Sequence, residues 1–227
     1  MLSLTLAALT LLACGYVLGR LRARARCRRL RLDLAMARHL AEHDSLTGLM
    51  NRSGAQHFYE TRTAAGTTLA AVLVDLDGFK AVNDTWGHQV GDAQLMAVAR
   101  RLTDACASIG AVASRLSGDE FLLLVPDADA DLVQEQVMGI LAQLGTPITL
   151  LAGDALMVSL TPGASAGIAV PQRDEPWSNL LRHADIALYQ AKSLGGQAVL
   201  YTSGMQHPAR RDLPGVRLRN SPLVNYA

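Results

Sequence analysis

Two pairs of acidic residues stand beside apolar segments, and this arrangement can hold a metal cation. Asp75 and Asp77 end the apolar run of residues 69–76, and at positions i and i+2 of a strand their side chains share one face. Asp119 and Glu120 lie between two short apolar segments, where adjacent carboxylates are costly unless a cation lies nearby. Carboxylate oxygens are the usual ligands of hard divalent cations. The alternative for each pair taken alone is a solvated surface turn.

Asn83 and Asp92 carry groups that can recognise a guanine base. An Asp carboxylate can accept bonds from the N1–H and the exocyclic amine of guanine, while Asn supplies a donor and an acceptor. The alternative is that Asp92 caps the N-terminus of the helix that follows it.

Lys80 and Lys192 are the only lysines among 21 basic residues. Because Arg occupies every other basic position, these two indicate sites that need a compact point charge, as phosphate binding does. The alternative is that Lys occurs at these two positions by chance.

Charge is unevenly distributed along the chain, although 21 basic and 20 acidic residues leave a net charge of only +1. Residues 44–204 contain 9 basic and 17 acidic residues, a net charge of −8. This segment is therefore not expected to bind nucleic acid through counterion release, but it can bind a nucleotide when a divalent cation supplies positive charge. The 50% hydrophobic content excludes a disordered chain, and three Cys are too few for a disulfide scaffold.

Residues 1–19 contain no charged side chain and, as a helix, nearly cross a hydrocarbon core of about 30 Å. Seven Arg follow within residues 20–31, which predicts that this flank stays in the cytoplasm. We therefore expect a single-pass transmembrane helix in the inner (cytoplasmic) membrane, with the domain of residues 44–204 in the cytoplasm. A cleavable signal peptide is disfavoured because no positive charge precedes the apolar run. A lipoprotein cleavage site at residues 11–14 (LLAC) is the alternative.

Residues 20–43 contain no Gly or Pro, which together with heptad-like apolar spacing predicts a basic juxtamembrane helical stalk. An ordinary amphipathic linker helix is the alternative. The heptad-like positions of the stalk are Leu30, Leu34, Ala37 and Ala41.

Residues 205–227 contain four Arg, three Pro and no apolar periodicity, so we expect a disordered tail.

Residues 44–204 alternate between strand-like and helix-like patterns. The order β-α-β-β-α-β-α-β predicts one α/β (α+β) domain with a mixed central sheet flanked by helices. The acidic pair 119–120 is placed at a hairpin turn. Expected strands cover residues 69–76, 112–115, 120–125, 157–170 and 197–201, and expected helices cover residues 92–108, 129–144 and 178–194.

Five motifs, in order and with ordinary spacing, closely resemble the GGDEF domain of diguanylate cyclases. The resemblance covers about residues 42–202. It implies a nucleotidyl-cyclase-like fold and the condensation of two GTP into cyclic di-GMP with release of two pyrophosphates. The motifs are DSLTGLMNR (44–52), DLDGFK (75–80), NDTWGHQVGD (83–92), RLSGDEF (115–121) and ADIALYQAK (184–192).

The resemblance implies a cation site at the acidic residues. Asp75 and Asp119 would hold Mg²⁺, or Mn²⁺ as the alternative, with the Leu76 carbonyl and Glu120 assisting. Cations there would bridge triphosphate oxygens and lower the pKa of the attacking 3′-hydroxyl. Either Asp119 or Glu120 would assist deprotonation of that hydroxyl, and the choice between them stays open.

The resemblance also implies how GTP is bound. Asn83 and Asp92 would read guanine, while Lys80, a member of the catalytic group, and Lys192 would neutralise phosphate charge. Each domain of this family binds one GTP, so the reaction implies a homodimer, which a membrane anchor would favour by raising the effective concentration. Further substrate contacts would come from Phe79, the Gly118 backbone and His88.

Three positions depart from the family pattern. Ser117 replaces the first Gly of the signature, and Gly196 replaces a phosphate-binding Arg. Residues 108–111 (SIGA) lack the Arg-x-x-Asp pattern of a product-inhibition site, so no allosteric product site is expected. The alternatives to an active cyclase are a catalytically degenerate GTP-binding or regulatory module, and an interaction scaffold.

Overall fold

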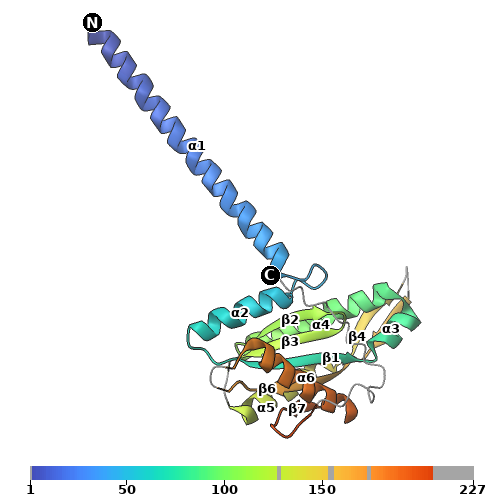
Figure 1. Ribbon diagram of the computed structural model, residues 1–227. Helices are drawn as coiled ribbons and strands as arrows, with labels where there is room; N and C mark the ends of the chain where they lie inside the picture. Colours follow the sequence, from blue (N-terminus) through green and yellow to red (C-terminus); the bar gives the residue numbers. More distant parts are fainter. Residues whose placement is uncertain (1, 127–128, 153–155, 173–174, 207–227) are drawn as a thin grey trace, which may run out of the picture.

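The protein is described by a computed structural model that covers residues 2–126, 129–152, 156–172 and 175–206. For residues 2–14, 17 and 18 it describes the backbone alone. One long helix extends away from a domain in which helices cover both faces of a central sheet (Figure 1). The expected tail over residues 205–227 lies almost wholly outside the described residues.

The helix α1 (Leu2–Glu42) is continuous through the stalk segment predicted from the sequence. Its described side chains at residues 15–16 and 19–41 are all exposed. The side chains of most of the expected transmembrane segment, residues 1–19, lie outside the described part of the chain. Within the part that is described, no helix combines the length and the apolar character needed to cross a membrane.

The central sheet has five strands in the order β2-β3-β1-β6-β7. Strand β1 lies in the middle and pairs antiparallel with both β3 and β6, whereas β6 and β7 are parallel. This confirms the prediction of a mixed sheet. The strands are β1 (Ala70–Asp77), β2 (Val112–Ser117), β3 (Glu120–Val125), β6 (Gly163–Ala169) and β7 (Ala198–Leu200).

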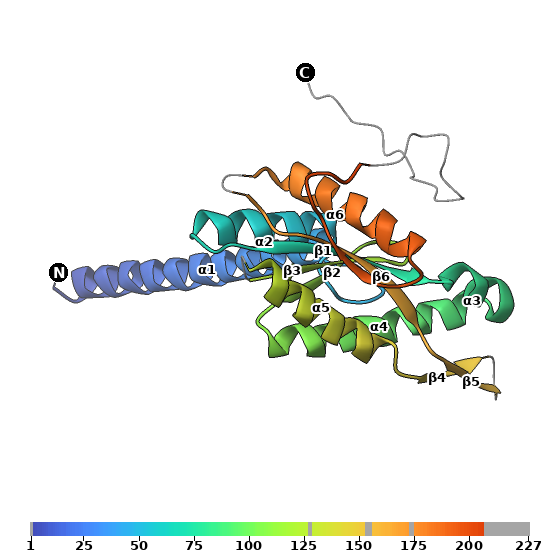
Figure 2. The same ribbon diagram turned by 90° about the horizontal axis from the view of Figure 1, so that it is seen from below.

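Helices cover both faces of the sheet (Figure 2). Alternate residues of β1 point to opposite faces, so Val72 and Val74 pack with α4 and α5 while Ala71 and Leu73 pack with α2 and α6. Burial on both faces explains the almost continuous apolar sequence of this strand. The helices are α2 (Arg52–Ala64), α4 (His88–Ser108), α5 (Ala130–Leu144) and α6 (Trp177–Ser193).

Three elements were not predicted from the sequence: α2, the short helix α3 (Phe79–Trp86) and strand β4 (Ile148–Ala152). Strand β4 pairs with β5 (Leu156–Leu160) in a separate hairpin that packs on α4. Helix α4 begins at His88, four residues earlier than predicted. Asp92 therefore lies inside the helix, and the alternative that it forms the N-cap is wrong.

Candidate active site

The sheet register brings the acidic residues of two motifs together. Asp75 of β1 lies directly opposite Glu120 of β3, and Glu120 in turn lies opposite Ser117 of β2. Asp119 lies in the two-residue turn between β2 and β3, where its carbonyl accepts a hydrogen bond from the Leu76 amide at 3.3 Å. Two carboxylates that are 45 residues apart in sequence thus become neighbours across adjacent strands.

Asp75 is the buried member of this acidic group, with 9% of its surface exposed. Burial raises the pKa of Asp75 to about 6 even though the Lys192 ammonium lowers it, and the carboxylates of Asp119 and Glu120 raise it further. Lys192 Nζ, from α6, lies 2.8 Å from Asp75 Oδ1. The electrostatic field at this strand edge therefore favours an additional cation.

Hard cations would suit the oxygen ligands of this group, although its side chains do not form a complete cage. Among the described residues, no three acidic, His or Cys side chains are close enough together to hold a metal by themselves. Mg²⁺ does not need such a cage, because it is usually held by one or two carboxylates and by the phosphates of a bound nucleotide. The donor set at Asp75 and Asp119 fits that mode of binding.

Asp77 lies on the same face as Asp75, as predicted, because it contacts Ser165, the residue paired with Asp75 on β6, but its environment differs. Its Oδ1 accepts a hydrogen bond from Ser165 Oγ of β6 at 2.8 Å, and its side chain is exposed. Gly196 lies beside it, because a Cβ added at Gly196 would be 3.1 Å from Asp77 Oδ2. Gly196 has a φ of 89°, so the local backbone at this departure from the family pattern favours glycine.

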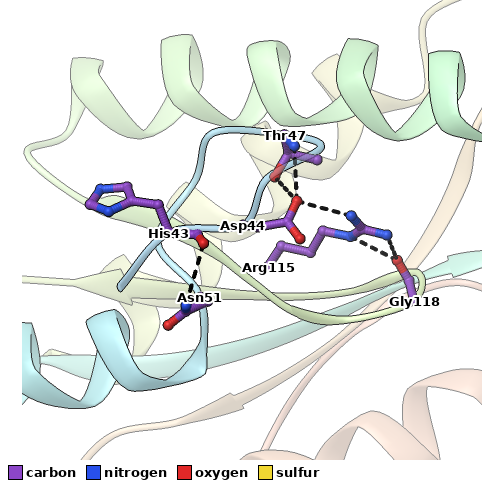
Figure 3. Close-up of polar contacts among 6 residues, drawn as sticks. All are labelled: His43, Asp44, Thr47, Asn51, Arg115 and Gly118. Carbon is purple, nitrogen blue, oxygen red and sulfur yellow. Dashed lines mark hydrogen bonds and ion pairs between the residues drawn. The ribbon is translucent and has the colours of Figure 1, made fainter. Parts of the chain in front are cut away.

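The turn that carries Asp119 is held by Arg115 (Figure 3). The Arg115 guanidinium donates to the Gly118 carbonyl at 2.9 and 2.8 Å and lies 2.9 Å from Asp44 Oδ1. Thr47 donates to the same oxygen of Asp44 through its amide and its hydroxyl. Burial alone would raise the pKa of Asp44, but the bonds from Thr47 and Arg115 outweigh it and hold that pKa below its usual value. The loop after α1 is thereby fastened to the turn.

The predicted guanine-reading residues come from two consecutive helices. Asn83 is part of α3, and its side chain lies against the backbone of Gly91 in α4, where any Cβ would overlap Asn83 Oδ1. Asp92 is the next residue of α4 and is exposed. The bend between the helices is at Gly87, whose φ of 85° strongly favours glycine. Asn83 therefore lies against the residue that precedes Asp92.

The other predicted site residues lie near the C-terminal end of β1. Phe79 begins α3 and packs partly against the main core, and Lys80 follows it with an exposed side chain. Gly118 is the left-handed residue of the hairpin turn, with a φ of 49°. His88 is the exposed first residue of α4.

Sequence reasoning assigned no role to Asp44, Gly91 or Arg115. Asp44 and Arg115 are 71 residues apart, so no local periodicity could reveal their ion pair. The sequence indicates only that each of them belongs to one of the five motifs. Gly91 was likewise part of a motif, but its importance depends on the approach of Asn83 from another helix.

Comparison with known proteins defines the class of this fold. A family model described as "Diguanylate cyclase, GGDEF domain" matches residues 41–198. Because the match covers most of the chain, the protein belongs to this GGDEF family, which confirms the resemblance. The curated relatives are longer, and the chain spans 20% of a Caulobacter vibrioides signaling protein and 38% of the response regulator PleD.

Individual relatives agree with this assignment. The coiled coil and GGDEF domain of DgcB from Caulobacter crescentus, solved in complex with c-di-GMP, gives a TM-score of 0.67 at 27% identity and covers 78% of this chain and 95% of that chain. Diguanylate cyclase SiaD from Pseudomonas aeruginosa gives 0.66 at 28% identity, covering 88% and 76%. PleD from Caulobacter vibrioides is 36% identical over 179 residues, or 75% of this chain.

Proposed function

We propose that the chain is an active, Mg²⁺-dependent diguanylate cyclase that condenses two GTP into cyclic di-GMP and releases two pyrophosphates. The observation that carries this proposal is the pairing of Asp75 with Glu120 across β1 and β3, with Asp119 in the adjoining turn and Lys192 beside Asp75. The described relatives support the product class, since SiaD is a diguanylate cyclase and DgcB was solved with c-di-GMP.

In this mechanism Asp75 and Asp119 would hold Mg²⁺, assisted by the Leu76 carbonyl and Glu120. A cation held by these residues would supply positive charge that offsets the negative charge developing on the triphosphate during the reaction. Asp119 or Glu120 would accept the proton of the 3′-hydroxyl as that oxygen attacks the α-phosphorus of the other GTP. Pyrophosphate leaves with the electron pair of the broken P–O bond, and a second such step closes the ring.

The remaining residues would orient the substrate. Asn83 of α3 and Asp92 of α4 would bind the guanine edge, and His88 at the start of α4 would contribute a further contact. Lys80 and Lys192 would offset phosphate charge, and Lys192 would exchange part of its contact with Asp75 for the nucleotide. Phe79 and the Gly118 backbone would shape the phosphate pocket.

The reaction needs two domains that face each other, so we propose a homodimer joined through the α1 stalk. We also propose that residues 1–19 anchor the chain as a single-pass helix in the inner membrane. The seven Arg of residues 20–31 support this orientation, because such residues are retained on the cytoplasmic side.

The test is to incubate the purified full chain with GTP and Mg²⁺ and to measure cyclic di-GMP by mass spectrometry. We expect product from the unsubstituted chain and none above background from Asp119→Ala. A chain that binds GTP without forming a cyclic dinucleotide, at concentrations where it is dimeric, would contradict the cyclase and favour the degenerate binding module.

A further inference from the structure

Ser117, the residue that departs from the family signature, makes a contact that a glycine cannot make. It ends β2, and Glu120 begins β3 directly opposite it. Ser117 Oγ donates a hydrogen bond to Glu120 Oε2 at 2.8 Å. Directly paired residues of antiparallel strands have Cβ atoms about 5 Å apart, which brings a short hydroxyl within reach of a Glu carboxylate.

The backbone at this position accepts a side chain. Ser117 is part of the strand, and the left-handed conformation in the turn is adopted by Gly118, with a φ of 49°. The register of β2 against β3 shifts between Arg115 and Ser117, which is what brings Ser117 opposite Glu120. The departure from Gly therefore requires no strained backbone, and the added atoms form a bond with a predicted cation ligand.

The hydrogen bond restrains Glu120 without saturating it. A carboxylate has two oxygens and about four lone-pair sites, so one bond to Oε2 leaves Oε1 available to a cation. Metal-ligating carboxylates are commonly hydrogen-bonded by neighbours that fix their orientation, and loss of such a neighbour typically weakens metal binding about 10–100-fold. Ser117 also acts from the same strand as Arg115, which holds the Gly118 carbonyl, so β2 fixes the turn at two points.

We propose that Ser117 is a positioning residue that orients Glu120 toward the catalytic cation. The inference rests on the proposed function in one respect, that Glu120 is a ligand of that cation. It further implies that a reversion to the family residue removes an interaction on which this chain depends.

The decisive measurement is the affinity of the full chain for Mn²⁺ in the presence of 3′-deoxy-GTP, followed by water proton relaxation. This nucleotide cannot form the new bond, so the readout does not require turnover. We expect Ser117→Ala and Ser117→Gly to weaken Mn²⁺ binding roughly 3- to 10-fold, which is at or below the lower end of the usual range because Ser117 is exposed. Ser117→Thr keeps the hydroxyl and should retain affinity, and Ser178→Ala, an exposed serine on α6, is the matched control.

A double-mutant comparison separates this role from a general effect on the hairpin. In a Glu120→Gln background, Ser117→Ala should cause no further loss of Mn²⁺ affinity. Three outcomes would each overturn the inference. Ser117→Ala could bind Mn²⁺ as tightly as the unsubstituted chain, or it could lose as much Mn²⁺ affinity in the Glu120→Gln background as in the unsubstituted background. The third is that the unsubstituted chain does not bind Mn²⁺. If Mn²⁺ binding changes as expected but no cyclic di-GMP forms, the cyclase proposal fails while the role of Ser117 stands.

Discussion

At the residue scale, the proposed chemistry depends on a carboxyl group whose surroundings oppose its ionisation. Asp75 is buried beside Asp119 and Glu120, and its pKa of about 6 lies above the ordinary value of 3.8. The folded chain therefore binds a proton more readily than the unfolded chain at pH values between about 4 and 6. Without a divalent cation, the contribution of this group to stability falls as the pH rises through that interval.

Replacing Asp75 by Asn should consequently separate stability from activity. We expect Asp75→Asn to unfold at a higher temperature than the unsubstituted chain at pH 8 without divalent cation, because a neutral side chain avoids the cost of burying charge. This difference should narrow as the pH falls from 8 to 4, where Asp75 itself becomes neutral. Cyclase activity should be lost at every pH. Thermal unfolding in EDTA across that range measures the effect, and a constant difference would contradict it.

A second residue-scale prediction concerns Gly91. A Cβ at this position overlaps Asn83 Oδ1, so Gly91→Ala should displace Asn83 from the proposed guanine site. Losing an aligned hydrogen-bonding group typically weakens binding by about tenfold or more. The measurement is GTP affinity by calorimetry. Gly139→Ala is the control, since nothing lies within 4 Å of its added Cβ, and it should raise helix stability by about 0.5–1 kcal/mol without affecting GTP binding. Equal GTP affinity in both variants would contradict the role of Gly91.

At the scale of elements, the helices and strands that could be predicted from the sequence are those with many buried apolar residues. Strand β1 and helix α5 were predicted because one is a continuous apolar run and the other has buried residues at helical spacing. Helix α3 has no fully buried residue and spans only eight residues between Gly78 and Gly87, both with positive φ, so its few apolar residues are too short a pattern to predict a helix. Strand β4 lies outside the central sheet, where only one of its faces is covered.

The sequence allows residue types to be proposed for the candidate site, but it does not give their contacts. The acidic pairs, the two lysines and Asn83 were identified because their chemistry is unusual in their surroundings. The contacts of Lys192 with Asp75 and of Ser117 with Glu120 depend on strand order and register, which arise from packing over long separations in sequence. Asp77 keeps the face that strand periodicity predicts, but its partner Ser165 belongs to β6 and could not be predicted from the local sequence.

The connection between the loop after α1 and the turn that carries Asp119 gives a prediction at this scale. Arg115 uses its planar fork to bind the Gly118 carbonyl and Asp44 together, and Lys cannot reproduce that geometry. We expect Arg115→Lys to lower the free energy of unfolding by about 1–3 kcal/mol and to reduce cyclase activity. Denaturant unfolding and product formation measure the two effects. Arg100→Lys, at an exposed position on α4, is the control and should change neither stability nor activity. If Arg115→Lys lowers stability but not activity, catalysis does not need the contacts of Arg115 with the turn.

At the scale of the whole molecule, the continuous α1 helix defines how two copies of the chain could meet. One face of the helix has apolar or small residues at alternating spacings of four and three, all of them exposed. In the proposed parallel dimer this seam would be flanked by Arg26 and Arg31 of opposite copies, which repel each other, and farther along by Asp33 and Arg38, which attract. The seam residues are Ala23, Cys27, Leu30, Leu34, Ala37 and Ala41.

This charge pattern predicts that the stalk responds to the membrane surface. Anionic headgroups neutralise Arg residues that lie within about a Debye length, so they should relieve the repulsion between the two copies. We expect Cys27 to be cross-linked between copies by a bismaleimide several-fold more efficiently in phosphatidylglycerol nanodiscs than in phosphatidylcholine nanodiscs. The experiment uses a Cys14→Ser chain. Cys106 should not react, because burial raises the pKa of its thiol to about 12.

The matched variant is Arg26→Glu, which would replace the repulsive contact with an attractive one to Arg31 of the second copy. Cross-linking of this variant should be efficient in both lipids, and its cyclase activity should lose any dependence on headgroup charge. Equal cross-linking of the parent chain in the two lipids would show that the Arg cluster does not oppose pairing of the stalks. Activity that follows cross-linking across both variants and both lipids would identify stalk pairing as the step that brings the two GTP sites together.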